Sequence, residues 1–148
     1  MHQDLTLSLR RSLDAAQAAA RERCQDFVST EHLMLGLLDT DSDALHALRS
    51  AHAEPQSLKS ALLASLPHGK PPPVVTGDLP LSPKAQRVIN GAIVTAQVLR
   101  ESHISTRFLL KSLLDEPQSV IRHALEKAGV DIDALVPSLA EKPSSPES

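Results

Sequence analysis

A stretch of eleven residues occurs twice in the chain, and this repetition constrains the fold more than any other feature. The first copy, residues 29–39, reads Ser-Thr-Glu-His-Leu-Met-Leu-Gly-Leu-Leu-Asp, and the second, 76 positions later (105 minus 29), reads Ser-Thr-Arg-Phe-Leu-Leu-Lys-Ser-Leu-Leu-Asp. Each copy opens with hydroxyl side chains that can accept the first free N–H groups of a helix. Each continues as an apolar run typical of a short buried helix. A duplicated structural unit is therefore the first expectation.

The same offset extends beyond this stretch. It aligns Leu5 with Leu81, Arg11 with Arg87, Ala16 with Ala92, Ala20 with Ala96, and Ala44-Leu45 with Val120-Ile121. We therefore expect two repeats, at about residues 5–66 and 81–140, that pack as one pseudo-two-fold domain over residues 1–140. The proline-rich residues 67–80 would link the repeats, and residues 141–148 would form a disordered tail or the start of another linker.

Each repeat is predicted to contain four helices, which gives an all-α fold with no convincing strand. Aromatic residues make up only 1% of the chain, so the core must consist of Leu, Ala, Val and Ile, which suits closely packed helices. The predicted helices run from the Thr6 cap to about residue 23, over 30–39, 43–51 and 55–66, from the Ser82 cap through Leu99, over 106–115, from Pro117 to a stop at Gly129, and from the Asp131 cap to about residue 140. Leu99 and Val120 are among the residues expected in the core.

Charge and motif content argue against most other classes of protein. A net charge of −3 provides no basic surface for nucleic acid or an anionic membrane, and no apolar run reaches the roughly 20 residues that cross a bilayer. The N-terminus lacks the features of a signal peptide. The single cysteine, Cys24, excludes an internal disulfide and is expected to be structural. Together these features predict a cytoplasmic protein.

No catalytic, cofactor or metal motif is present. The seven histidines lack ligand spacing on a helix face, the five glycines are isolated, and no serine or cysteine lies in a nucleophile motif. We therefore expect no metal, no cofactor and no enzymatic activity, and interpret the chain as a binding protein.

The sequence resembles the N-terminal domain of Clp ATPases, the ring-forming unfoldases that feed a partner protease. Residues 29–38 resemble the family's signature Gly-Thr-Glu-His-Leu-Leu-Leu-Gly-Leu-Leu, and residues 82–88, Ser-Pro-Lys-Ala-Gln-Arg-Val, resemble its second-repeat opening Thr-Pro-Arg-Ala-Lys-Arg-Val. The resemblance covers about residues 5–140. It implies two tandem four-helix repeats, the double Clp-N motif, and a docking module for protein adaptors or substrates, while ATP hydrolysis belongs to other modules.

The resemblance also implies ligand sites for phosphorylated arginine. The signature glutamate meets the guanidinium, and a capping threonine and the helix start receive the phosphate, since a helix N-terminus attracts anions. Carried over, the first site would use Thr6 and Glu31, and the second Ser82 and Arg107. The flanking candidates for ligand or protein binding are Thr30, His32, Thr106 and Phe108.

The second copy departs from the family pattern. Arg107 replaces the acidic residue and Phe108 replaces histidine, so we expect phosphoarginine binding at the first repeat only, with Arg107 left to attract a plain anion. Two alternatives stay open from the residues. Glu31 can simply stabilise its helix dipole, worth about 0.3–1 kcal/mol, and Phe108 can be either a core residue or an exposed docking anchor.

The expected function is a protein-interaction module of Clp N-terminal type, monomeric, placed before ATPase modules or free-standing. A free-standing chain would serve as an adaptor, a competitor for clients, or a ligand sink. A helical DNA-binding regulator is the alternative from another class, and the acidic charge balance opposes it.

Overall fold

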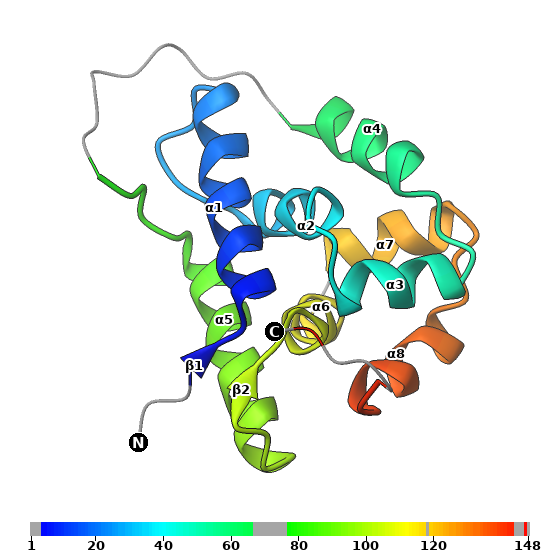
Figure 1. Cartoon of the computed structure of the whole chain (residues 1–148). Helices are drawn as coiled ribbons and strands as arrows, with labels where there is room; N and C mark the ends of the chain where they lie inside the picture. Colours follow the sequence, from blue (N-terminus) through cyan, green and yellow to red (C-terminus); the bar gives the residue numbers. More distant parts are fainter. Residues whose placement is uncertain (1–3, 67–76, 118, 144–146, 148) are drawn as a thin grey trace.

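The computed structural model describes residues 4–66, 77–117, 119–143 and 147. Its elements are β1 (Asp4–Leu5), α1 (Leu7–Glu22), α2 (Thr30–Leu38), α3 (Asp43–Ser50), α4 (Pro55–Ser65), α5 (Pro83–Val98), β2 (His103–Ile104), α6 (Thr106–Asp115), α7 (Val120–Lys127) and α8 (Ile132–Ala140) (Figure 1). Most of the predicted linker (residues 67–76) and half of the predicted tail (residues 144–146 and 148) lie outside the described residues. The domain and linker boundaries therefore stay predictions.

The helices begin where hydroxyl and carboxylate side chains cap them. Six helices have a capping side chain that accepts a backbone N–H from the first turn, supplied by Thr6, Ser29, Ser42, Ser82, Ser119 and Asp131. Pro55 and Pro83 lie in first turns, where a missing N–H costs nothing. The prediction that Pro117 opens a helix is wrong, because Ser119 provides the cap and α7 begins after it.

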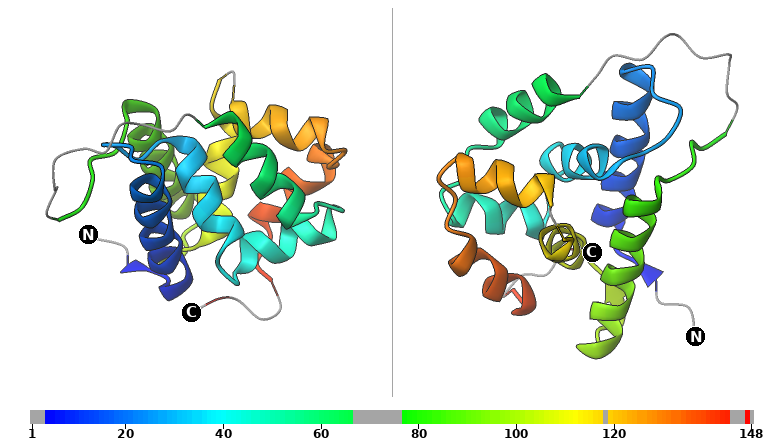
Figure 2. Two further views of the ribbon diagram at one scale, coloured as in Figure 1. Left: turned by 90° about the horizontal axis from the view of Figure 1, so that it is seen from above. Right: turned by 180° about the vertical axis from the view of Figure 1, so that it is seen from behind.

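The eight helices form three groups across the molecule. In Figures 1 and 2, α1 and α5 lie along one side, α2 and α6 run through the middle, and α3, α4, α7 and α8 cover the other side. The two central helices carry most of the largest fully buried side chains, including Leu33, Leu35, Leu37, Phe108 and Leu110. This position explains why nearly all residues of both helices are buried. None of the described helices is both long and apolar enough to cross a bilayer.

Two short parallel contacts join the repeats, and they correct the prediction that the chain has no strand. β1 pairs with β2, with Leu5 opposite Ile104. An isolated bridge joins Val28 to Leu81 in the same parallel sense. Strands of one or two residues show no alternation of apolar and polar positions, so sequence periodicity cannot reveal them.

The offset between the repeats changes partway along the chain. It is 76 for the capping pair of α2 and α6 (105 minus 29) but 77 for the caps of α3 and α7 (119 minus 42), because α6 is one residue longer than α2. The alignment of Ala44-Leu45 with Val120-Ile121 was therefore wrong by one position. Val120 is 46% exposed and Leu99 is 40% exposed, so neither belongs to the core as expected. The helix stop at Gly129 is confirmed by its left-handed φ of 82°.

Close approach of helices differs between the repeats. A Cβ on Gly36 of α2 would lie 2.1 Å from the backbone oxygen of Ser12 in α1. At the position equivalent to Gly36, Ser112 of α6 instead donates a hydrogen bond of 2.6 Å to the carbonyl of Val88 in α5. The side chain of Ser112 finds room because Gly91 faces it. Helices α1 and α2 therefore pack through a glycine, and α5 and α6 through a serine hydroxyl.

Candidate functional site

Helix starts from different repeats lie together at two places, which we name the α2/α5 end and the α1/α6 end. At the α2/α5 end, Val28 N donates to Pro80 O and Ser82 N donates to Val28 O, both at 2.8 Å. At the α1/α6 end, Thr6 N donates to Ile104 O at 3.0 Å. Each end therefore combines one helix start from the first repeat with one from the second.

This arrangement corrects the pairing of residues that we predicted. The structure does not bring Thr6 to Glu31, or Ser82 to Arg107. Instead Ser82 lines one cavity with Thr30 and Glu31, while Thr6 and Arg107 line another. The parallel bridges cross between the repeats, so each capping residue meets the signature stretch of the other repeat.

The cavity at the α2/α5 end has a volume of about 460 Å³. Its wall combines exposed apolar side chains, charged groups and helix starts: Phe27, Ser29, Thr30, Glu31, Ser82, Pro83, Lys84, Arg87, Glu116, Ser119 and Val120. Phe27 and Val120 are 40% and 46% exposed. The site thus offers apolar contact beside polar groups, as ligand sites usually do.

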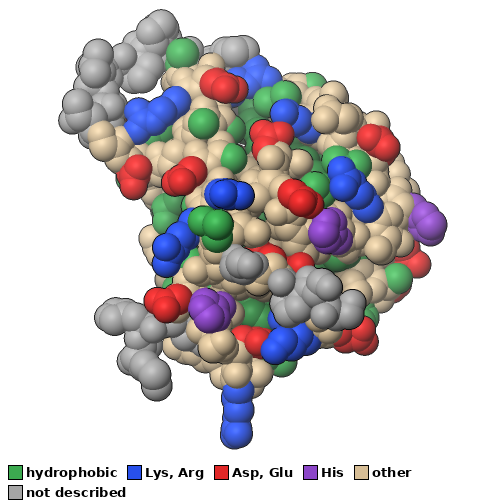
Figure 3. Space-filling view, in the orientation of Figure 1, with side chains coloured by type: hydrophobic (Ala, Val, Ile, Leu, Met, Phe, Trp, Pro, Cys, Tyr) green, Lys and Arg blue, Asp and Glu red, His purple; other side chains and the backbone are tan. Residues whose placement is uncertain are grey.

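Anion-binding groups concentrate at this end. The first N–H groups of Thr30, Glu31 and Lys84 have no hydrogen-bond partner among the described residues. The Lys84 side chain is exposed, and Arg87 forms a 2.7 Å ion pair with Glu116. Over the face shown in Figure 3, acidic and basic side chains are interspersed. Attraction for an anion therefore arises locally, from two helix starts and a lysine, rather than from a charged surface.

Glu31 is half-buried at the edge of this cavity. Its carboxylate makes no hydrogen bond or ion pair with the rest of the described chain. A carboxylate beside two anion-attracting helix starts can hold the cationic part of a ligand whose anionic part lies at those starts.

His32 lies beneath the α2/α5 end, 1% exposed. Its Nδ1 accepts the N–H of Ser29 at 2.9 Å, completing a capping box at the start of α2. Burial lowers the pKa of His32, Arg23 lowers it further, and Glu31 opposes the shift. His32 was predicted as a binding residue, but in this structure its ring is covered and positions the start of α2 instead.

We expect the stability of the protein to fall in mild acid because of His32. Above the ordinary histidine pKa of about 6.5, neither state is protonated. As the pH falls below that value, the unfolded chain takes up a proton that the buried ring resists, and the free energy of unfolding decreases. Each unit by which burial lowers the pKa is worth about 1.4 kcal/mol. Urea unfolding between pH 7.5 and 5.5 measures this decrease.

Two variants isolate the contribution of His32. His32→Phe introduces the residue that the second repeat carries as Phe108, and it should reduce the loss of stability between the two pH values. His123→Phe changes an exposed histidine and should leave the loss unchanged. Identical pH dependence in His32→Phe and the wild type would rule out a role for His32.

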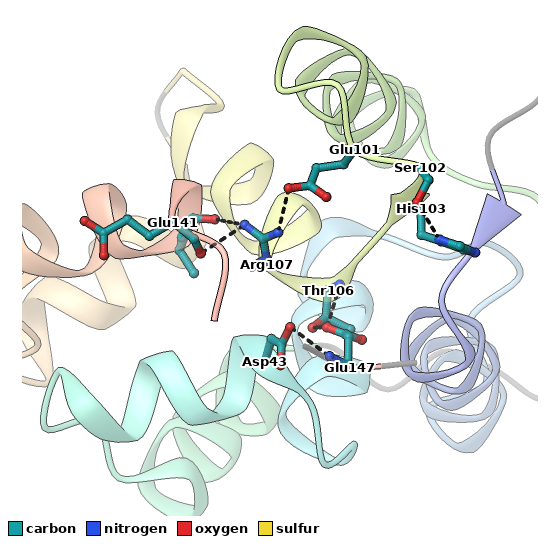
Figure 4. A network of polar contacts seen from close by, with 9 residues as sticks. Asp43, Glu101, Ser102, His103, Thr106, Arg107, Glu141 and Glu147 are labelled. Atoms are coloured by element: carbon teal, nitrogen blue, oxygen red, sulfur yellow. Dashed lines mark hydrogen bonds and ion pairs between the residues drawn. The ribbon is translucent and has the colours of Figure 1, made fainter. Parts of the chain in front are cut away.

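Arg107 and Phe108 are buried at the α1/α6 side of the core. The guanidinium of Arg107 is directed toward the end of α8 and toward Glu101 (Figure 4). It donates to the carbonyls of Leu139 and Glu141 at 3.1 Å, and lies 3.4 Å from the Glu101 carboxylate. It also lies 4.5 Å from the centre of the Phe108 ring.

These contacts decide the alternative left open for Phe108 and correct the expectation for Arg107. Phe108 is 0% exposed, so the core interpretation is confirmed and the docking-anchor alternative is wrong. Arg107 is 5% exposed and bound to the C-terminal carbonyls of α8. Arg107 was expected to attract a plain anion, but its guanidinium is buried and pairs with protein carbonyls and with Glu101 instead. In the described part of the chain, no group of three acidic, histidine or cysteine side chains could hold a metal ion.

Comparisons with known proteins agree with this architecture. The family described as "Clp repeat (R) N-terminal domain" matches residues 4–107 and again residues 81–144. The ClpA homolog of Cyanidium caldarium, an ATP-binding subunit of an ATP-dependent Clp protease, is 31% identical over 122 residues, covering 81% of this chain and 14% of that protein. Chloroplastic ClpC1 of Oryza sativa subsp. japonica is 29% identical, covering 78% and 12%. The chain thus spans about one seventh of the length of these relatives.

Solved structures share the fold. The Hsp104 N-terminal domain from Candida albicans superimposes with a TM-score of 0.79 at 20% identity, covering 94% of this chain and 91% of that one. A ClpV N-domain in complex with a VipB peptide gives 0.74 at 20% identity, covering 93% and 85%. The shared fold agrees with the two matches of the family model, which show that the chain belongs to the Clp repeat (R) N-terminal domain family.

Proposed function

We propose that this chain is a non-catalytic docking module that binds adaptor or substrate proteins for a Clp unfoldase and protease system. The observation that carries the proposal is the α2/α5 end, where two helix starts, Lys84 and Glu31 surround a cavity with exposed apolar walls. The VipB peptide bound to a ClpV N-domain of the same fold supports a peptide as the kind of ligand.

The ligand chemistry that suits this end is phosphorylated arginine on a protein. The Glu31 carboxylate would accept hydrogen bonds from the guanidinium. The phosphate would lie at the free N–H groups of Thr30 and Lys84, near the Lys84 ammonium. Phe27 and Val120 would contact the apolar stem and neighbouring residues of the ligand. The α1/α6 end offers no equivalent, because Arg107 replaces the acidic residue and is bonded within the core.

Replacing Glu31 with alanine should weaken binding of a phosphoarginine-bearing peptide by about tenfold or more, because a charge-assisted hydrogen bond is lost. Isothermal titration with that peptide gives the affinity. Glu54→Ala is the matched control, since Glu54 is an exposed glutamate that forms no side-chain bond at the start of α4. Equal affinity in all three proteins, or no binding by the wild type, would contradict the proposal.

The same module would function in front of ATPase modules, as the family's description as an N-terminal domain suggests, or as a free-standing competitor for Clp clients. We place this function in the cytoplasm and expect a monomer. Sedimentation of the purified chain measures the oligomeric state.

A further inference from the structure

The α1/α6 end already holds a carboxylate, and it comes from the chain itself. Glu147 accepts a hydrogen bond from the Thr106 N–H at 3.1 Å (Figure 4). It also accepts one from the Thr6 hydroxyl at 3.0 Å. The Thr106 hydroxyl also donates to it. The backbone N–H of Glu147 donates to the Asp43 carboxylate at 3.2 Å. Both the side chain and the backbone of Glu147 are therefore held.

The starts of α1 and α6 contact this carboxylate, and the start of α3 contacts the backbone N–H of Glu147. Thr6 caps α1, Thr106 is the first residue of α6, and Asp43 is the first residue of α3. The N–H of Ala44 in α3 donates to the Thr106 hydroxyl at 3.1 Å, which leaves the hydroxyl hydrogen free to point at Glu147. The positive ends of the α1 and α6 dipoles stabilise a negative charge at this position.

The start of α6 needs such a partner. In α2 a capping box pairs the backbone N–H groups of Ser29 and His32 with each other's side chains. In α6 phenylalanine replaces the histidine, and Ser105 makes no capping hydrogen bond. The Ser105 hydroxyl is buried and has no partner among the described residues. It lines, with Glu147, a cavity of about 180 Å³. Glu147 therefore provides a hydrogen-bond acceptor at the start of α6, where the second repeat has no capping box.

We propose that Glu147 is an intramolecular ligand of the α1/α6 end, and that an acidic segment of another protein binds there only by displacing it. The two ends then differ in availability: the α2/α5 end is open, and the α1/α6 end is occupied by the chain's own carboxylate. This proposal is independent of phosphoarginine binding, because it involves neither Glu31 nor Lys84.

Amide hydrogen exchange of Thr106 in the full chain tests the occupancy. Thr106 N–H has no intrahelical partner at the first position of α6, so its protection depends on Glu147. Glu147→Ala should raise its exchange rate about tenfold or more. Glu141→Ala removes the side chain of a nearby glutamate whose backbone oxygen accepts a hydrogen bond from Arg107, and it should leave the Thr106 rate unchanged. An unchanged rate in Glu147→Ala would overturn the proposal.

A peptide added in trans tests displacement. The probe is a capped peptide with the sequence of residues 142–148, with a second version in which Glu147 is Gln. The acidic peptide should restore Thr106 protection in Glu147→Ala. In the wild type, at least about tenfold more peptide should be needed than in Glu147→Ala. The peptide must there replace the tethered Glu147 carboxylate, which acts at a millimolar effective concentration. The readout there is the Thr106 amide resonance of labelled protein, whose shift reports each occupant. Equal effects of the two peptides, or no effect of either, would refute a carboxylate-specific docking site.

Discussion

Gly36→Ala is expected to lower the free energy of unfolding by about 3 kcal/mol, at the upper end of the range for overpacked cores. The added Cβ would lie 2.1 Å from the Ser12 carbonyl oxygen and 3.1 Å from the Ala16 nitrogen. Both are backbone atoms of α1, so no side chain can rotate to relieve the contact. The two helices must separate, which disturbs the apolar contacts between them. Urea unfolding of the full chain measures the loss.

The second repeat provides the matched controls for this variant. Gly91→Ala would place its Cβ 2.4 Å from the Ser112 hydroxyl, a side-chain atom that can turn away, so its loss should be smaller. The double variant Gly91→Ala/Ser112→Gly has alanine and glycine at the positions equivalent to Ala15 and Gly36 of the first repeat. It should therefore recover part of the stability that Gly91→Ala loses. If Gly36→Ala lowers the free energy of unfolding no more than Gly91→Ala does, the close approach of α1 and α2 does not determine the cost of a side chain at position 36.

Arg107→Ala is expected to cost about 3 kcal/mol of stability. Its guanidinium bonds two carbonyls at the end of α8 and lies beside Glu101, while its face covers the Phe108 ring. Charge-assisted hydrogen bonds from a buried group contribute about 1.5–3 kcal/mol each, and their loss leaves buried carbonyls without a donor. The end of α8 should also exchange its amide hydrogens faster.

Arg87→Ala is the control for that experiment. Arg87 forms a shorter ion pair, with Glu116 at 2.7 Å, but its side chain is 59% exposed. Pairs of this kind contribute less than about 1 kcal/mol. A loss in Arg107→Ala no larger than in Arg87→Ala would show that burial of the guanidinium does not strengthen its contacts.

Much of the fold could be predicted because the information is local. Hydroxyl caps such as Thr6 and Ser82, and a left-handed stop at Gly129, mark helix ends within a few residues of the chain. The duplicated apolar stretch identified the two helices at the centre. Where the offset changed to 77, weak apolar matches misled the alignment, and Val120 was wrongly placed in the core.

The candidate site could be predicted only in part. The relevant residues, including Ser82, Thr30 and Glu31, were identified, but their pairing depends on the bridge between Val28 and Leu81. A bridge between two single residues has no periodic sequence pattern, so the sequence does not predict which helix starts lie together. Glu147 escaped notice for a related reason, because a single glutamate in a segment of proline and serine carries no pattern of burial. Its role is visible only from the threonines that it contacts.

The crossed bridges also bear on how such a protein could diversify. One repeat alone can build neither end, whereas two identical subunits related by a two-fold axis would build two identical ends. When the two copies are joined in one polypeptide, their sequences no longer need to be identical. Substitutions such as Arg107 and Phe108 then alter one end while Glu31 and His32 keep the other, and a single gene comes to encode two unlike recognition surfaces.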